Sequence, residues 1–191
     1  GTMMVPLCYV FMWAVSKNSW ISAFTTALLV FDFMHFTLSR IGTIDIIVAC
    51  FILLTFYLMY LVLKRLKHGI DRCTVLLMIL NGCAAGAAMA TKWTGVYAGA
   101  GIALMFFLFL MREYIPAHGK RDILTLFGIC VAVHLCIPAV IYVLSYLSYP
   151  MQPGEHLLKK MWDNQVLMLT YHESTVFDHP YSSEWYEWIW M

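Results

Sequence analysis

Arg40 and Lys92 are two isolated cations, each in a short polar turn between apolar runs. The two turns read SRIGTID (39–45) and TKWTG (91–95). An arginine guanidinium offers a planar fork of donors and a lysine amine offers a compact point charge, and both suit the oxygens of a phosphate. The two residues therefore favour binding of an anionic ligand. Lys92 has a second interpretation, because it precedes Trp93 and a lysine–tryptophan pair is also typical of an anchor at a membrane surface.

Two carboxylates and a histidine accompany Arg40 along the chain. Asp32 and His35 are three residues apart and share a face of the predicted helix, and Asp45 follows the turn. A charged group at membrane depth is costly unless it is paired or hydrated. Two interpretations therefore stay open: an Asp–His or Arg–Asp pair that holds helices together, or a functional set. Asp45 is also a candidate for a general base, although it begins a helix and can cap free amide groups there.

The polar tail from Tyr149 to Met191 holds His156, His172 and His179 among several carboxylates. Their spacings do not match H-E-x-x-H or a comparable metal signature, so we expect no metal site. The tail ends in HPYSSEWYEWIW, which combines aromatic faces with hydroxyl and imidazole donors. This stretch is compatible both with a rigid turn at the level of the lipid headgroups and with a sugar or peptide site.

The composition indicates the setting in which these residues act. Of 191 residues, 62% are hydrophobic and 12% are charged, whereas a soluble domain is about half apolar and about a quarter charged. The chain is therefore predicted to be a membrane protein. Its formal net charge of +1 gives no electrostatic footprint for nucleic acid, so we expect no nucleic-acid partner. The six cysteines lack C-x-x-C spacing and are interpreted as small buried hydrophobic residues.

Six apolar segments must position the polar residues. They lie at about 3–15, 20–38, 43–63, 74–91, 94–111 and 122–148. A bilayer core needs about 20 apolar residues per helix, and lipid cannot satisfy irregular backbone. The sequence therefore predicts an all-α, polytopic transmembrane helical bundle. Within it, Gly82 and Gly86, and likewise Gly95 and Gly99, are spaced to let helix backbones approach closely.

The orientation follows from the cations, because Lys and Arg in short loops are retained on the cytoplasmic side. If the segments alternate in direction, eight of the twelve cations share one side: Lys17, Lys64, Arg65, Lys67, Arg72, Arg112, Lys120 and Arg121. That side is predicted to be cytoplasmic. Arg40, Lys92 and the loop 149–191 are then exoplasmic, and residues 1–148 form the transmembrane region.

Three blocks of the sequence together resemble one family. They are ALLVFDFMHFTLSRIGTIDI (27–46), AAMATKWTGVYA (87–98) and NQVLMLTYHESTVFDHPYSSEWYEW (164–188). Their order and separation are similar to those of the protein O-mannosyltransferases, which are membrane glycosyltransferases of the GT-C class. The resemblance implies that mannose passes from a polyprenyl-phosphate-mannose donor to Ser or Thr hydroxyls of a secreted or translocating protein. It also implies the exoplasmic face and inversion at the sugar carbon. We expect no cofactor, because no metal is required if Arg40 and Lys92 neutralise the charge of the leaving phosphate.

Carried over position by position, the resemblance places Arg40 and Lys92 near the phosphate of the lipid donor. It assigns a loop motif near the substrates to Gln165, His172, His179, Tyr181 and Ser182. No β-trefoil insert is visible between Tyr149 and Trp190. The chain therefore resembles the bacterial-type members of the family, which lie in the plasma membrane.

The chain departs from the family in one respect that matters for catalysis. Family members hold an Asp–Glu pair whose Asp is regarded as the catalytic base, and no Asp–Glu dipeptide occurs in this chain. We therefore expect the chain to correspond to a central part of such an enzyme, without the later C-terminal helices. The base is expected upstream of Gly1, and residues 1–191 alone are expected to be inactive. If the base lies within the chain instead, Asp45 is the first candidate.

Two alternatives to a protein mannosyltransferase remain. The first is another polyprenyl-phosphate-sugar transferase of the same class that acts on a lipid or a glycan. The second is a membrane transporter in which Asp32, His35 and Asp45 carry ions. A transporter is expected to show inverted repeats or paired broken helices, and the sequence shows neither.

Overall fold

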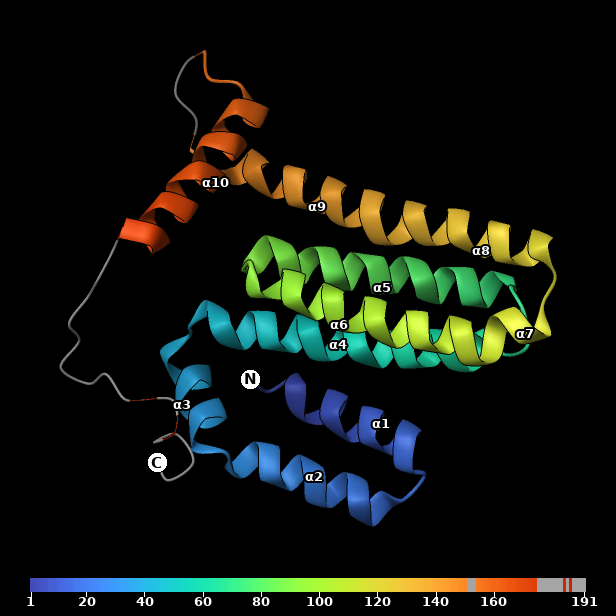
Figure 1. The fold of residues 1–191 in the computed structure, drawn as a ribbon. Coiled ribbons are helices and arrows are strands. Elements are labelled where there is room, and N and C mark those ends of the chain that lie inside the picture. Colours follow the sequence, from blue (N-terminus) through green and yellow to red (C-terminus); the bar gives the residue numbers. More distant parts are fainter. Residues whose placement is uncertain (151–153, 175–183, 185, 187–191) are drawn as a thin grey trace. The chain divides into compact units, whose positions relative to one another are not determined.

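The computed structural model describes residues 1–150, 154–174, 184 and 186, and these residues contain helices and no strand (Figure 1). The chain divides into two compact units, Gly1–Ser145 and Tyr146–Met191. The prediction of an all-helical protein is confirmed.

The first unit consists of helices joined by short turns. They are α1 (Met4–Ser16), α2 (Ser19–Phe31), α3 (Phe33–Ile41), α4 (Ile44–Leu66), α5 (Arg72–Thr91), α6 (Thr94–Phe109), the π-helical η1 (Leu110–Tyr114), α7 (Ile115–Ala117), α8 (Lys120–Val131), the π-helical η2 (Ala132–Cys136) and α9 (Ile137–Ser145). The second unit contains η3 (Tyr146–Ser148) and α10 (Leu157–Ser174). Part of the segment 149–191, which the sequence predicts as a loop, is therefore helical.

Capping residues set several helix boundaries. Asn18 accepts a hydrogen bond of 2.9 Å from the backbone N–H of Trp20 at the start of α2. Asp71 does the same for Thr74 at the start of α5, at 2.6 Å. Such side chains satisfy amide groups that have no partner within the first turn of a helix. Gly42 ends α3 with a φ of 71°, a backbone conformation that residues with a Cβ rarely adopt.

Four helical stretches are long and apolar enough to cross a membrane, namely Ile44–Leu66, Arg72–Thr91, Thr94–Ala117 and Lys120–Ser148. α2 and α3 form a fifth span only if they are taken together, because they meet at an angle of 57°. α1 is apolar but shorter. All six predicted segments are thus helical, and four or five meet the length requirement of a span rather than about six. These helices are those of an integral, multi-pass membrane protein.

The bundle is built around α4 and α5, which pack against each other (Figure 1). α6 contacts both of them, and η2 and α9 pack on α5. A Cβ on Gly82 would meet the backbone carbonyl of Val133, and a Cβ on Gly86 would lie 2.9 Å from the Cα of Pro138. These two glycines therefore allow the close helix packing that their spacing predicts.

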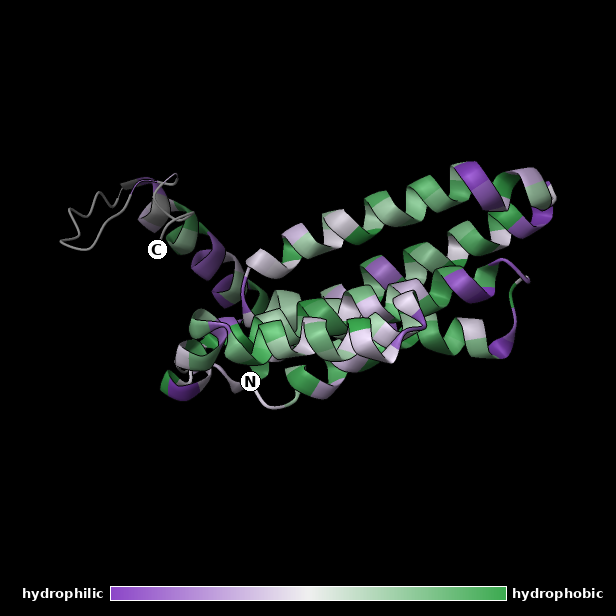
Figure 2. Ribbon diagram, turned by 90° about the horizontal axis from the view of Figure 1, so that it is seen from below, coloured by the Kyte–Doolittle hydropathy of each residue, from purple (hydrophilic) through white to green (hydrophobic). Residues whose placement is uncertain are grey.

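The apolar side chains face two environments, the core of the bundle and its outer surface. Met59, Val62 and Met78 belong to the buried core of the bundle. Many other large hydrophobic side chains are exposed, and Figure 2 shows hydrophobic residues over much of the helices. Such outer faces suit contact with lipid, which is as apolar as a protein core. The prediction that the cysteines are buried is wrong for Cys73 and Cys136, which are exposed, because the outer face of a membrane helix accepts small apolar residues equally well.

Candidate functional site

The turns that carry Arg40 and Lys92 lie at the same end of the bundle. α4 begins after the first turn and α5 ends at the second, and these two helices are antiparallel neighbours (Figure 1). The Nζ atom of Lys92 donates a hydrogen bond of 2.5 Å to Oδ1 of Asp45. The two side chains are 40% and 44% exposed. The ion pair therefore links the two turns while staying open to a ligand.

The backbone holds both members of this pair. Asp45 lies in the first turn of α4, where the helix dipole favours a carboxylate. Lys92 ends α5 in an extended conformation, and its backbone N–H donates to the carbonyl of Ala88 at 3.1 Å. A Cβ on Gly95 would lie 2.5 Å from the carbonyl carbon of Ala88, so the α5–α6 turn is tight. The two backbones thus bring the carboxylate and the amine together.

The pair is better suited to positioning than to stabilising the fold. A partly exposed ion pair contributes only about 0.2–1 kcal/mol to stability. A lysine ammonium has three N–H donors, and Asp45 accepts one of them. Among the described residues the other two donors of Lys92 have no acceptor, so they are left for the oxygens of a bound anion.

Arg40 differs from Lys92 in its surroundings. It lies in the last turn of α3, and its guanidinium carbon is 5.4 Å from the centroid of the Phe36 ring. In the described part of the chain, no carboxylate lies within ion-pair distance of Arg40. The Arg–Asp pair left open by the sequence is therefore not formed there. Arg40 thus has no ion-pair partner among the described residues, at the end of the bundle that also holds Asp32 and the Lys92–Asp45 pair.

The side-chain pair of Asp32 and His35 does not form either. Asp32 stands between α2 and α3, and its carboxylate accepts a hydrogen bond of 2.6 Å from the backbone N–H of His35. The helix predicted to run from residue 20 to 38 is thus broken at Asp32. The Nε2 atom of His35 and the Oγ1 atom of Thr43 are buried without a hydrogen-bond partner among the described residues. Buried polar atoms normally have a hydrogen-bond partner, which can be an ordered water molecule.

The tail residues of the candidate site belong to the second unit. Gln165 lies on α10, where its Nε2 atom donates to the hydroxyl of Tyr146 at 2.8 Å and to the carbonyl of Met161 at 3.3 Å. His172 lies in the last turn of α10. The remaining three residues lie outside the described part of the chain: His179, Tyr181 and Ser182. The loop motif near the substrates therefore stays a prediction.

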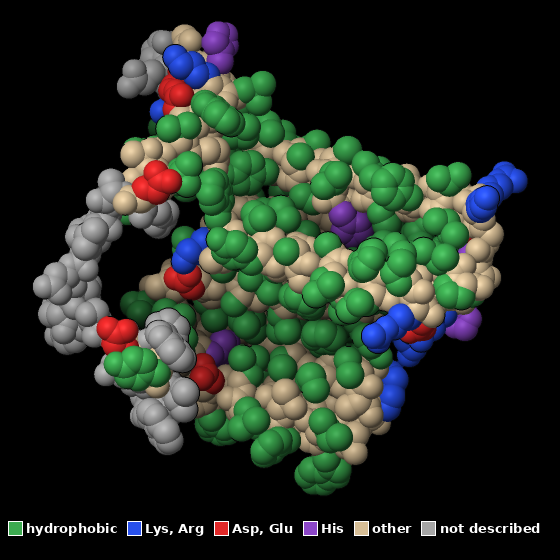
Figure 3. Space-filling view, viewed as in Figure 1, with side chains coloured by type: hydrophobic (Ala, Val, Ile, Leu, Met, Phe, Trp, Pro, Cys, Tyr) green, Lys and Arg blue, Asp and Glu red, His purple; other side chains and the backbone are tan. Residues whose placement is uncertain are grey.

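Cations gather at the other end of the bundle. Figure 3 shows Lys and Arg side chains over the end where α7 lies. Here Arg65 pairs with Asp71 at 3.0 Å, and Lys67 pairs with Glu113 at 2.6 Å. Hydrogen bonds from Thr74, together with Arg65, hold the pKa of Asp71 well below its usual range. The positive-inside rule associates such an end with the cytoplasm.

One polar cluster inside the bundle is absent from the sequence-based predictions. Asn81 is fully buried on α5, and its Nδ2 atom donates to the carbonyl of Thr55 on α4 at 2.6 Å. Its Oδ1 atom lies 2.9 Å from Nε2 of His134 on η2. The cluster thus ties three segments together. A signal was present in the sequence, because an Asn and a His within apolar runs are expected to find polar partners.

No group of three or more His, Cys, Asp and Glu that could hold a metal occurs among the described residues.

The match to a protein family identifies the kind of protein that carries this site. A family model described as dolichyl-phosphate-mannose-protein mannosyltransferase matches residues 1–148, which include both turns of the candidate site. The chain belongs to this family.

Membership of the dolichyl-phosphate-mannose-protein mannosyltransferase family implies protein O-mannosyltransferase activity from a lipid-linked mannose donor. The resemblance seen in the sequence is confirmed. No curated protein and no solved structure matches the chain.

Proposed function

We propose that this protein transfers mannose from polyprenyl-phosphate-mannose to Ser or Thr hydroxyls of proteins on the exoplasmic face. We further propose that Arg40 and Lys92 bind the phosphate of the donor. The observation that carries the proposal is the Lys92–Asp45 ion pair at the same end of the bundle as Arg40, which has no carboxylate partner among the described residues. All three residues lie within the part that matches the family model.

The charges of these residues suit the chemistry. Lys92 pairs with Asp45, whereas Arg40 has no ion-pair partner among the described residues and can offer its charge to the single negative charge of a phosphodiester donor. During transfer the acceptor oxygen forms a bond to the sugar carbon, and the bond from that carbon to the phosphate oxygen breaks. The phosphate leaves with the electron pair and gains negative charge. Fixed cations stabilise charge that develops in this way.

Asp45 serves in this proposal to position Lys92 and not as the general base. Its Oδ1 atom already accepts the hydrogen bond from Lys92. Protonation of Asp45 by an acceptor hydroxyl would remove the negative charge that holds the amine. The base that takes the hydroxyl proton is therefore assigned to another residue.

The placement of this end on the exoplasmic side rests on the cations at the opposite end of the bundle. The loop motif is proposed to lie near donor and acceptor, and this part of the proposal is supported only by the family resemblance. Its residues are Gln165, His172, His179, Tyr181 and Ser182.

A transfer assay in membranes that contain the protein tests the proposed substrates. We expect mannose from polyprenyl-phosphate-mannose to appear on a peptide that contains Ser or Thr, and no comparable transfer from the glucose analogue of the donor. Transfer only to a lipid or glycan acceptor would assign the protein to a different reaction of the same chemical class.

The assay also tests Arg40. Substitution Arg40→Lys keeps the charge but loses the planar fork of donors, so the KM for the donor should rise while the amount of folded protein stays constant. Arg121→Lys is the matched control, because it makes the same change at the opposite end of the bundle, at the start of α8. An equal rise in KM for both variants would contradict the proposed role of Arg40.

A further inference from the structure

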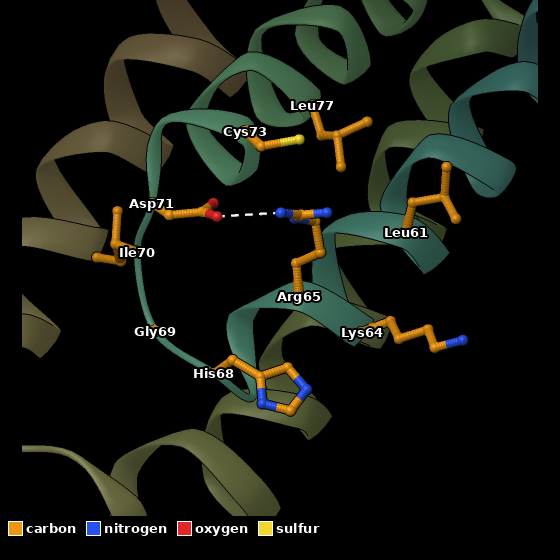
Figure 4. Close-up of a pocket in the computed structure, with 9 residues that line it drawn as sticks. All are labelled: Leu61, Lys64, Arg65, His68, Gly69, Ile70, Asp71, Cys73 and Leu77. Atoms are coloured by element: carbon orange, nitrogen blue, oxygen red, sulfur yellow. Dashed lines mark hydrogen bonds and ion pairs between the residues drawn. The ribbon is translucent and has the colours of Figure 1, made fainter.

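Two adjoining grooves lie at the cation-rich end of the bundle. The first has a volume of about 760 Å³, and Figure 4 shows its residues at the end of α4, in the α4–α5 turn and at the start of α5. The second has a volume of about 540 Å³ and lies between α4 and the end of α6 with η1. Lys64 and His68 line both grooves. They therefore stand on the ridge between them.

The charges in the grooves do not cancel. Asp71 pairs with Arg65, and Glu113 pairs with Lys67. These two carboxylates are the acidic residues of the lining. Lys64 in both grooves and Arg112 in the second have no carboxylate within ion-pair distance among the described residues. The grooves thus present two uncompensated cations, which suit an anion.

Asp71 does not neutralise this surplus. Hydrogen bonds from the hydroxyl and the backbone N–H of Thr74 hold it at the start of α5, and Arg65 donates to its other oxygen at 3.0 Å. In Figure 4 the Arg65 side chain points at Asp71, whereas Lys64 points away from this pair. The positive charge of Lys64 is therefore left to the grooves.

Each groove changes from basic to apolar along the bundle. On α4, Leu61 lies about one helical turn before Lys64, on the side toward the middle of the bundle, and Leu77 lies correspondingly on α5. In the second groove, Met105 and Leu108 on α6 likewise lie toward the middle of the bundle relative to Arg112. A phospholipid has this polarity, with its headgroup at the membrane surface and its acyl chains toward the middle. A soluble anion has no part that would fill the apolar portions.

We propose that these two grooves bind one anionic phospholipid, with its phosphodiester at Lys64, His68 and Arg112 and its acyl chains along the apolar residues of the grooves. Basic pockets at the cytoplasmic ends of membrane helices bind anionic lipid headgroups in this manner. The site lies at the opposite end of the bundle from Arg40 and Lys92, so it is separate from the donor phosphate. It does not depend on the proposed transferase activity.

Native mass spectrometry of the purified protein tests the proposal, with phosphatidylglycerol and phosphatidylcholine of the same acyl chains as probes. We expect phosphatidylglycerol to bind at least about tenfold more tightly, since each cation near the surface favours an anionic lipid about fivefold. Substitutions Lys64→Gln and Arg112→Gln should each weaken phosphatidylglycerol binding about fivefold, and together about 25-fold. Lys64→Arg should bind like the wild type.

Controls separate this site from a general surface charge. Lys120→Gln with Arg121→Gln removes two cations near the same end that line neither groove, and binding should change less than about twofold. Glu113→Gln releases Lys67 from its partner and should strengthen binding about fivefold. Equal weakening by the control pair would overturn the proposal, as would equal binding of both lipids.

Two further probes identify the source of the phosphate. Glycerophosphoglycerol, which is the headgroup without acyl chains, and inorganic phosphate should not displace phosphatidylglycerol at millimolar concentrations. Displacement by either would make the site one for a soluble anion. Displacement by polyprenyl-phosphate-mannose would show that the grooves bind the donor, and both results would overturn the proposal.

Discussion

Variants of the Lys92–Asp45 ion pair distinguish a structural role from a role in donor binding. A structural role predicts a loss of stability, and a binding role predicts a loss of donor affinity. The perturbations are Lys92→Gln, Asp45→Asn and the double variant. Both side chains are more than a third exposed, so loss of the pair should cost at most about 1 kcal/mol of stability. A cost of that size lowers the Tm by about 2–4 °C in a chain of this length.

The expected effect on donor binding is larger and depends on charge. Lys92→Gln leaves Asp45 as an uncompensated negative charge beside the proposed phosphate position. Two like charges about 4 Å apart repel by about 1 kcal/mol in water and about 4 kcal/mol near a protein surface. Lys92→Gln should therefore raise the donor Kd between about fivefold and about 800-fold.

The double variant decides between the two roles. Removing the charge of Asp45 as well relieves the repulsion, so Lys92→Gln with Asp45→Asn should bind the donor more tightly than Lys92→Gln alone. Asp45→Asn by itself loses the charge that holds the amine but also removes a negative charge near the phosphate, so it should change the donor Kd less than Lys92→Gln does. The assays are titration with polyprenyl-phosphate-mannose in lipid nanodiscs and a thermal unfolding scan of each variant. Wild-type donor affinity in all three variants, with lowered Tm, would refute this reasoning and make the pair a structural one.

Three further predictions concern the bundle. Gly82→Ala should cost about 1–3 kcal/mol of stability because the new Cβ meets the backbone of η2. Gly128→Ala, which has open space around the new Cβ, should be neutral or stabilising by up to about 1 kcal/mol. Equal losses of stability for the two variants in thermal unfolding would contradict the packing argument. A variant with Cys73 as its only cysteine should react with an impermeant maleimide only after permeabilisation, and one with Thr94→Cys should react in intact cells; the reverse pattern would invert the orientation. Asn81→Leu should lower stability by about 1–2 kcal/mol, as expected for a hydrogen bond between membrane helices, and an unchanged Tm would show that the buried cluster does not hold the bundle together.

The sequence predicts the helices well because hydropathy over about 20 residues is a property of each segment alone. The break in the second segment was missed although its signal was local. Asp32 is a good N-cap residue, and its carboxylate accepts the backbone N–H of His35. In an apolar segment the same Asp was interpreted as a partner for a side chain. In the structure Asp32 instead caps a new helix, α3, and this role breaks the segment.

The site residues were predicted only one at a time. Lys92 and Asp45 were each singled out, but their contact joins turns 47 residues apart and depends on how α4 and α5 align. The same holds for Asn81 and His134, which come together only because η2 packs on α5. Contacts between distant segments are set by packing, and a single sequence carries little record of packing. The phosphate role of Arg40 came from the family resemblance and from charge, and it stays a prediction.

The most direct test of the central claim compares the same charge loss at the two ends of the bundle. The measurement is the Kd for polyprenyl-phosphate-mannose in phosphatidylcholine nanodiscs, for Arg40→Gln and for Lys64→Gln. Loss of charge-assisted hydrogen bonds from Arg40 should cost about 1.5–3 kcal/mol, which is a rise in Kd of about 10- to 150-fold. Lys64→Gln should stay within about twofold of the wild type. A loss of donor binding for Lys64→Gln, with the Kd of Arg40→Gln unchanged, would place the donor phosphate at the cation-rich end of the bundle and contradict the account.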